Sequence, residues 1–175
     1  FCEAGLHLGL LDRDDIRFAL AEQIGHGGVS EVPVTAEVVA MRREENPCIE
    51  AIRTLRSQLM LRWLDKNVGN NKCLAIVSIE ERVGRSFIMA NLAALFSQLG
   101  QRTLLVDANM LSPRAHRIFS IDNSIGLSFV LSDRPARGAI VHINAVSGLA
   151  VLPAGPIPPN PQELLSSQRF RHLIE

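Results

Sequence analysis

Apolar and polar positions along this chain alternate in a way that predicts helices and strands in turn from Asn46 onward. Asn46 followed by Pro47 has the form of a helix start, with an N-cap residue and then proline at the first helical position. The helix is expected to run to about Leu64. Its apolar residues recur at helical spacing and predict a buried stripe of Ile52, Leu55, Leu59 and Trp63.

Short apolar runs bounded by turn residues predict buried strands at 73–77, 103–106 and 149–152. The segments between and after these runs predict helices at 86–99, 114–119, 127–132 and 162–175. Strands that alternate with helices are typical of an α/β fold, a parallel sheet flanked by helices. Ligands of such folds bind at the carboxyl ends of the strands.

The beginning of the chain has a different pattern. Residues 1–28 are expected to form a small helical module, because apolar residues recur at helical spacing after the N-cap candidate Asp12. A linker is expected over 29–45, and the α/β domain over 46–175. The chain begins at Phe1 and stops inside an expected helix, so we expect it to be a fragment of a longer protein.

Composition narrows the class of protein. The 175 residues are 47% hydrophobic, enough for one core with a small appendage. A net charge of zero gives no argument for a nucleic-acid partner or an anionic membrane surface. Three cysteines lie far apart without a pairing pattern, which fits a reducing cytoplasm. The longest apolar stretch, 87–96, is too short to span a bilayer.

The segment between the first predicted strand and the next helix has the layout of a phosphate-binding loop. Unpaired N–H groups and the positive end of the helix dipole converge at such a helix start. The usual pattern is G-x-x-x-x-G-K-[ST]. Gly84 and Ser86 match it here, whereas Ile79 stands at the first glycine position and Arg85 at the lysine position. The plainer alternative is an ordinary strand-to-helix turn with Ser86 as its cap.

The loop contains acidic residues that oppose the binding of an anion and basic residues that favour it. Glu80 and Glu81 would repel a polyanion, and Arg82 and Arg85 partly offset them. Asp107 directly follows the strand predicted at 103–106, and it therefore falls at the same edge of the sheet as the loop. It is either a structural hydrogen-bonding residue or part of a metal or phosphate site.

Five segments share their order and spacing with one family, and they are 50–59, 90–108, 113–119, 126–131 and 152–165. The last segment, LPAG followed by PPNPxELL, is the most specific of the five. Together they resemble the bacterial tyrosine kinases, the P-loop kinases that govern chain length in exopolysaccharide and capsule synthesis. Residues 3–25 also resemble the N-terminal helical module of type II secretion and pilus ATPases.

The resemblance implies a ligand and the residues that hold it. It implies that ATP binds through Gly84, Arg85 and Ser86, that Ser86 and Asp107 hold Mg²⁺, and that Asp107 is catalytic. It also implies a chain-length determinant membrane protein as partner. It further implies that the protein is cytoplasmic and that it can be held at the inner membrane, as a peripheral protein, by that partner.

Glu50, Arg53 and Arg56 lie three residues apart and share one flank of the first predicted helix. Such a triplet is usually a solvated face with weak pairing between neighbouring turns. In the family that the chain resembles, this triplet packs subunits into a ring. The resemblance therefore implies a homo-oligomer interface at these three residues.

The chain departs from the family pattern at several chemical positions. Gly84 is the only glycine left in the loop, Asn109 replaces a second carboxylate, and Leu111 replaces an arginine. An asparagine cannot act as a general base. The family's Walker B strand and tyrosine cluster are expected beyond Glu175. The chain contains no tyrosine, so it cannot phosphorylate itself on one.

Two hypotheses stay open at this point. The first is an ATP-binding kinase-type domain of exopolysaccharide synthesis and export. The second is a catalytically silent relative that keeps the fold and binds partner subunits or the membrane protein. A partition or septum-site ATPase ranks last, because those enzymes carry an early lysine where this chain has Ser78, Ile79 and Glu80.

Overall fold

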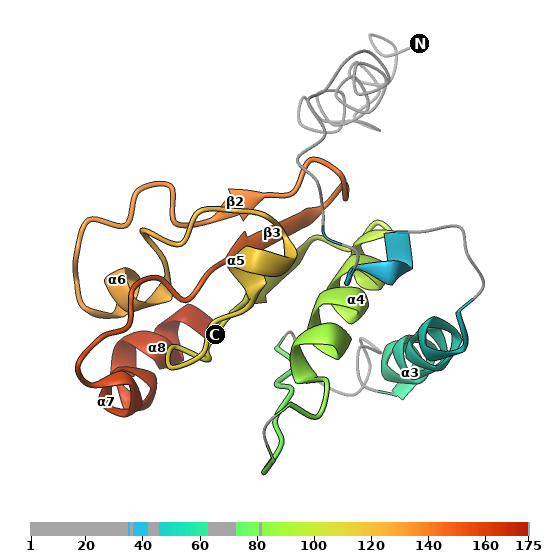
Figure 1. Ribbon diagram of the computed structural model, residues 1–175, viewed down its shortest axis with the longest axis horizontal. Helices are drawn as coiled ribbons and strands as arrows, with labels where there is room; N and C mark the ends of the chain where they lie inside the picture. Colours follow the sequence, from blue (N-terminus) through green and yellow to red (C-terminus); the bar gives the residue numbers. More distant parts are fainter. Residues whose placement is uncertain (1–34, 36, 42–45, 63–72, 81, 175) are drawn as a thin grey trace, which may run out of the picture. The chain divides into compact units, whose positions relative to one another are not determined.

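The computed structural model (Figure 1) describes residues 35, 37–41, 46–62, 73–80 and 82–174. All of them belong to the second of two compact units into which the chain divides, Val32–Glu175. The helical module expected at 1–28 lies outside the described residues, and so does Trp63 of the expected stripe.

The sheet has three strands, β1 (Thr103–Val106), β2 (Val141–His142) and β3 (Leu149–Leu152), in the order β1-β3-β2. β1 and β3 pair in parallel with Thr103 opposite Leu149, whereas β2 pairs antiparallel with β3. The predictions of strands at 103–106 and 149–152 and of an α/β fold are confirmed. The short antiparallel strand β2 was not predicted.

The prediction of a buried strand at 73–77 is wrong. Residues 73–78 have no regular secondary structure, and Val77 is 83% exposed. A strand exists only when a neighbouring strand takes up its backbone hydrogen bonds. In the described part of the chain no strand pairs with this segment, and an apolar run by itself does not reveal whether a partner is present.

The α-helices in the described part of the chain are α3 (Pro47–Arg62), α4 (Arg85–Ser97), α5 (Ala115–Ile118), α6 (Leu127–Leu131), α7 (Pro161–Ser166) and α8 (Gln168–Ile174). Each corresponds to a predicted helical segment. The helix expected at 162–175 is divided at Ser167, whose backbone is extended. The expected stripe on α3 is partly wrong, because Leu55 is exposed while Ile49 and Ile52 are buried.

α4 is the central helix of the main core. It packs against α3 on one side and against β1 and β3 on the other, as Figure 1 shows. The sheet residues of this core are Leu105, Leu149 and Val151. A second core on the opposite face of the sheet contains Leu152 and residues of α6, with α7 and α8 packed against it. Alternate strand residues therefore serve opposite faces, as the pleat requires.

The polar residue Asn91, fully buried in α4, fixes residues 35–41 to this core. Its side-chain oxygen accepts a hydrogen bond from the Ala40 N–H at 2.8 Å, and its amide donates to the Glu37 carbonyl at 2.9 Å. The one-turn helix η1 (Val39–Met41) follows, and Val38 and Ala40 are buried beside α4. This part of the expected linker is thus packed against the α/β domain.

The LPAG segment is the docking site of α6. The N–H of Leu127 donates to the Pro153 carbonyl at 2.8 Å, and that of Ser128 donates to the Ala154 carbonyl at 2.9 Å. Gly126 allows this approach, because a Cβ there would lie 2.3 Å from the Pro153 oxygen. Asn123 exchanges two further hydrogen bonds with Gly155. The specificity of this motif therefore has a structural basis in close backbone packing.

We expect Gly126→Ala to destabilise the domain by about 1–3 kcal/mol or more, because the added methyl group collides with backbone atoms that cannot turn aside. Urea unfolding followed by circular dichroism measures this loss. Ser132→Ala, at the exposed C-cap of the same helix, is the matched control and should change stability by less than about 0.5 kcal/mol. Equal effects of the two substitutions would contradict the close packing.

Candidate functional site

The loop before α4 is bent at two positions with positive φ, Arg82 at 61° and Gly84 at 87°. Gly84 is the residue immediately before the first turn of α4, in the left-handed conformation that glycine adopts without strain. Its carbonyl accepts the first helical hydrogen bond, from the Ile88 N–H at 3.0 Å. The surviving glycine is therefore at the position where the backbone requires one.

The first turn of α4 is open to an anion. The backbone N–H groups of Arg85, Ser86 and Phe87 have no hydrogen-bond partner in the described part of the chain. The half-buried Arg85 guanidinium and the Ser86 hydroxyl likewise have no partner among the described residues. Free amides at the positive end of a helix dipole favour a phosphate or carboxylate.

The rest of the loop is less favourable for a phosphate. The Ser78 hydroxyl donates to the Glu80 carbonyl at 2.7 Å, and the Glu80 side chain is exposed. Ile79, at the position of the missing first glycine, is fully exposed. Glu81 lies outside the described residues. The helix end of this loop thus has the geometry of an anion site, while its first half contributes an acidic side chain.

Asp107 lies directly after β1 and is buried, with 5% of its surface exposed. One carboxylate oxygen accepts from the Arg114 and Ala115 N–H groups at 2.9 Å each, and the other accepts from the Asn109 N–H at 3.2 Å. Two of these donors begin α5, so Asp107 acts as the cap of that helix from seven residues away. Of about four lone-pair sites on a carboxylate, three are occupied by backbone donors.

The neighbours of Asp107 extend this structural role. Asn109 accepts from the Ser112 N–H at 3.2 Å and closes the turn after β1, while Leu111 is exposed. The Arg114 guanidinium pairs with the Glu37 carboxylate at 2.8 Å. Sequence reasoning missed Asn91, Glu37 and Arg114 as connecting residues. An asparagine within an otherwise apolar helix was a sequence signal that could have identified Asn91. No sequence signal indicated the ion pair between Arg114 and Glu37.

His116, the second residue of α5, is half-buried, and its Nδ1 atom has no hydrogen-bond partner among the described residues. Burial lowers the pKa of this imidazole from its ordinary value of 6.5, and the Arg117 charge lowers it further. Asp107 and Asp122 act in the opposite direction with a smaller effect. The neutral ring is therefore the form that the folded domain favours.

The predicted interface triplet on α3 is divided between two environments. Arg53 forms an ion pair with Glu50 one turn away, and both side chains reach the surface. Arg56 instead donates to the Leu95 carbonyl of α4 at 3.3 Å and is partly buried. Two of the three residues are thus available to a partner, whereas Arg56 connects α3 to α4.

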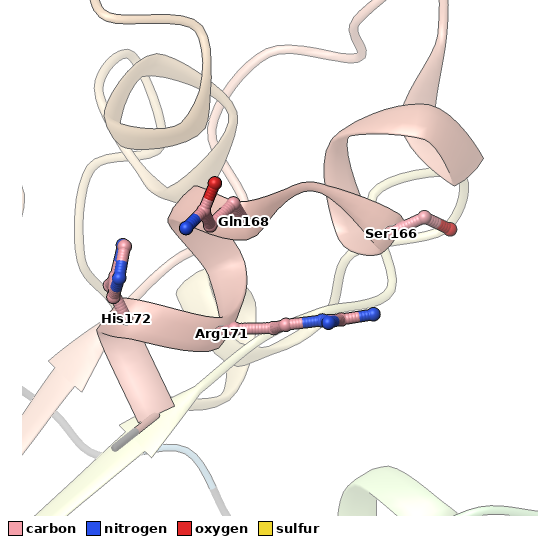
Figure 2. Close-up of a pocket in the computed structure, with 4 residues that line it drawn as sticks. All are labelled: Ser166, Gln168, Arg171 and His172. Atoms are coloured by element: carbon pink, nitrogen blue, oxygen red, sulfur yellow. The ribbon is translucent and has the colours of Figure 1, made fainter.

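A separate polar hollow lies on α7 and α8, lined by Ser166, Gln168, Arg171 and His172 (Figure 2). The side chains of Arg171 and His172 leave α8 in different directions, so they do not converge on one point. None of the predicted site residues lines this hollow.

Among the described residues there is no cluster of three or more side chains suited to a metal ion. None of the described helices has the length and apolar character needed to cross a membrane.

Comparison with known proteins places these features in context. No family model matches the chain. The tyrosine-protein kinase wzc of Salmonella typhi is 33% identical over 139 residues, which is 79% of this chain and 19% of that protein. The chain therefore spans about a fifth of the length of this relative.

Solved structures with the same fold include two related proteins. The chimerical protein CapA2B2 aligns with a TM-score of 0.67 and 31% identity, over 89% of this chain and 67% of that chain. The kinase domain of the Escherichia coli tyrosine kinase ETK aligns with a TM-score of 0.72 and 29% identity, over 84% of this chain and 55% of that one.

Removing the Asp107 carboxylate should cost the domain about 1–3 kcal/mol, because buried backbone donors lose their acceptor. We expect urea unfolding of Asp107→Ala to show this loss in the absence of any ligand. Glu80→Ala removes an exposed carboxylate with no partner in the described structure and should change stability by less than about 0.5 kcal/mol. An Asp107→Ala domain as stable as the parent would argue against the capping role.

Stability should fall when the pH decreases from about 7.5 to about 5.5, in part through His116. The unfolded chain binds a proton at the ordinary pKa of 6.5, while the folded imidazole with its lowered pKa resists protonation. Stability is therefore full above 6.5 and decreases as the pH falls toward the folded value. Urea midpoints of His116→Gln should decrease less than those of the parent, whereas exposed His142→Gln should behave like the parent. Identical pH profiles for all three proteins would contradict this assignment.

Proposed function

Because the chain belongs to the family of bacterial tyrosine-protein kinases, we propose that it is an ATP-binding P-loop domain of exopolysaccharide biosynthesis and export. Its role in that process is the regulation of polysaccharide chain length. The observation that carries this proposal is the first turn of α4, where three backbone amides have no partner in the described part of the chain. The relatives' kinase names support a nucleotide as the ligand.

Each residue of the first turn has a definite role in this proposal. Gly84 lets the backbone turn so that the amides after it face the phosphates. Arg85 supplies positive charge and a planar fork that matches two phosphate oxygens. The amides of Ser86 and Phe87 donate to the same oxygens. This part of the site needs no carboxylate, and its residues fit the phosphate group of a nucleotide.

Two residues of this chain would hold Mg²⁺, Ser86 directly through its hydroxyl and Asp107 through a metal-bound water. Bound Mg²⁺ keeps several waters and takes only one or two protein oxygens beside the phosphates. The Ser86 hydroxyl is free of partners among the described residues and fits this role directly. Asp107 has one lone-pair site left, so it fits as an acceptor for a metal-bound water. Mg²⁺ with ATP supplies an electrophilic phosphoryl group, and the chain offers no tyrosine of its own to receive it.

The partner proposed is the chain-length determinant membrane protein, with this domain on its cytoplasmic side. Self-association is proposed through the α3 surface that carries Glu50 and Arg53. Arg56 would hold α3 in place for this contact, because it donates a hydrogen bond to the Leu95 carbonyl of α4.

A catalytically silent relative is the second candidate function. The engagement of Asp107 with three backbone donors favours it, because a carboxylate held in this way is a poor general base. In this case the domain would still bind subunits through α3, and binding of nucleotide would serve structure alone.

The test is a titration of the 175-residue chain with a fluorescent ATP analogue in the presence and absence of Mg²⁺. We expect saturable binding in the micromolar range, weakened about tenfold or more by Arg85→Ala, since a charge-assisted contact of about 1.5–3 kcal/mol is lost. Ser86→Ala should reduce the gain that Mg²⁺ provides. Arg102→Ala removes an exposed arginine outside the loop and should bind like the parent. No saturation at millimolar nucleotide in a folded sample would reject the proposal.

A further inference from the structure

Residues 35 and 37–41 form a strap that lies against α4, with η1 as its last turn (Figure 1). Val38 is 1% exposed and Ala40 is 4% exposed, and both belong to the main core. At the carboxyl end of α4, the side-chain amide of Gln98 donates to the Ala40 carbonyl at 3.2 Å. The strap is therefore a packed part of the domain, although it precedes α3 in sequence.

Asn91 joins the strap to the first turn of α4. Its side-chain oxygen accepts a hydrogen bond from the Ala40 N–H at 2.8 Å. Its amide donates to two carbonyls at 2.9 Å each, that of Glu37 in the strap and that of Phe87 in α4. The N–H of Phe87 is one of the three amides without a partner in the described part of the chain. One fully buried side chain thus contacts both the strap and the turn to which the phosphate is assigned.

A second connection leads from the strap to the residue assigned to the Mg²⁺ side of the site. The Glu37 carboxylate pairs with the Arg114 guanidinium at 2.8 Å, and the Arg114 N–H donates to the Asp107 carboxylate at 2.9 Å. Thr35 adds two hydrogen bonds to the Ile118 carbonyl of α5, from its N–H at 3.1 Å and from its hydroxyl at 3.0 Å. The strap is therefore linked to both halves of the candidate nucleotide site and supplies no ligand to either.

We propose that docking of the strap on α4 controls the affinity of the first turn of this helix for the phosphates of a nucleotide. This control, which rests on the proposed nucleotide binding, acts through Asn91. While the strap is docked, the Asn91 amide is fixed and holds the Phe87 carbonyl, so the turn is ordered before the phosphate arrives. When the strap leaves, Asn91 loses both strap partners, and its buried oxygen has no donor. The side chain then turns to other partners, and nucleotide binding has to order the turn as well.

Control of this kind is reciprocal. If a docked strap strengthens nucleotide binding by a given factor, bound nucleotide strengthens docking of the strap by the same factor. The strap also follows the compact unit Phe1–Glu31 in the chain, so it is the covalent connection between that unit and the nucleotide site. Any contact that displaces the strap would therefore lower the affinity for nucleotide.

Hydrogen–deuterium exchange of the 175-residue chain, with and without a saturating fluorescent ATP analogue and Mg²⁺, measures this coupling. The Ala40 N–H is bonded to Asn91, so its exchange reports opening of the strap. We expect peptides that contain Val38 and Ala40 to exchange about fivefold or more slowly when nucleotide is bound. Peptides from the largely exposed loop 132–138 should be unchanged.

Two results would overturn the coupling and leave nucleotide binding intact. The first is unchanged exchange of the strap in a sample that binds the analogue. The second is exchange of the strap at the rate of β3 both with and without nucleotide, because the strap would then open only when the whole domain unfolds. Failure of the folded chain to bind the analogue would instead reject the proposed function, and the coupling with it.

A pair of valine variants tests the coupling from the side of the strap. Val146, in the turn between β2 and β3, is 3% exposed and belongs to the same core as Val38. Val38→Ser and Val146→Ser remove the same apolar group from that core, so both should lower stability in urea. We expect only Val38→Ser to speed exchange of the strap and to weaken binding of the analogue, by about threefold or more.

Equal affinities of the two variants, with faster strap exchange in Val38→Ser alone, would contradict the proposal. Should either variant fail to fold, the exchange of the parent chain with and without nucleotide decides the question.

Discussion

The carboxylate of Asp107 is the interaction on which the arrangement of this domain most depends. Its two oxygens receive three backbone N–H groups, and its own N–H donates to β3 at 3.0 Å. One buried residue thus fixes the end of β1, the turn after it and the start of α5. Through the ion pair of Arg114 with Glu37, the same residue is linked to the segment before α3. A buried charge is tolerated here because backbone donors satisfy it.

Because Asp107 has this structural role, nucleotide binding and phosphoryl transfer have to be considered separately, although the family resemblance implies both. The phosphate binding proposed at α4 would depend on the free amides, Gly84 and Arg85, and none of these contacts Asp107 in the described structure. Chemistry that needs a second carboxylate near a metal has less support, because Asn109 takes its place and accepts a backbone hydrogen bond instead. Binding of a nucleotide and transfer of its phosphoryl group are therefore separate questions for this chain, and loss of one does not imply loss of the other.

The sequence predicted those elements whose signals are local. Asn46 and Pro47 mark the start of α3, and the runs that became β1 and β3 have neighbours within the chain to pair with. It also placed Gly84 at the start of α4, where the structure shows a positive φ of 87°. It did not predict that residues 35–41 pack in the core, because the contact depends on Asn91, more than fifty residues away in sequence. The capping role of Asp107 was also not predicted, although its place at the edge of the sheet was.

The wrong prediction at 73–77 has a different cause and bears on how the loop works. An apolar run reports that a segment is suited to a sheet, whereas the pairing itself depends on a second strand. Among the described residues, this loop is fixed by α4 at its helix end, whereas the segment before it has no strand partner and contacts the main core through Ile76. Fixing the backbone of a residue costs about 1–2 kcal/mol, so a loop held at one end loses more entropy when it closes on a phosphate.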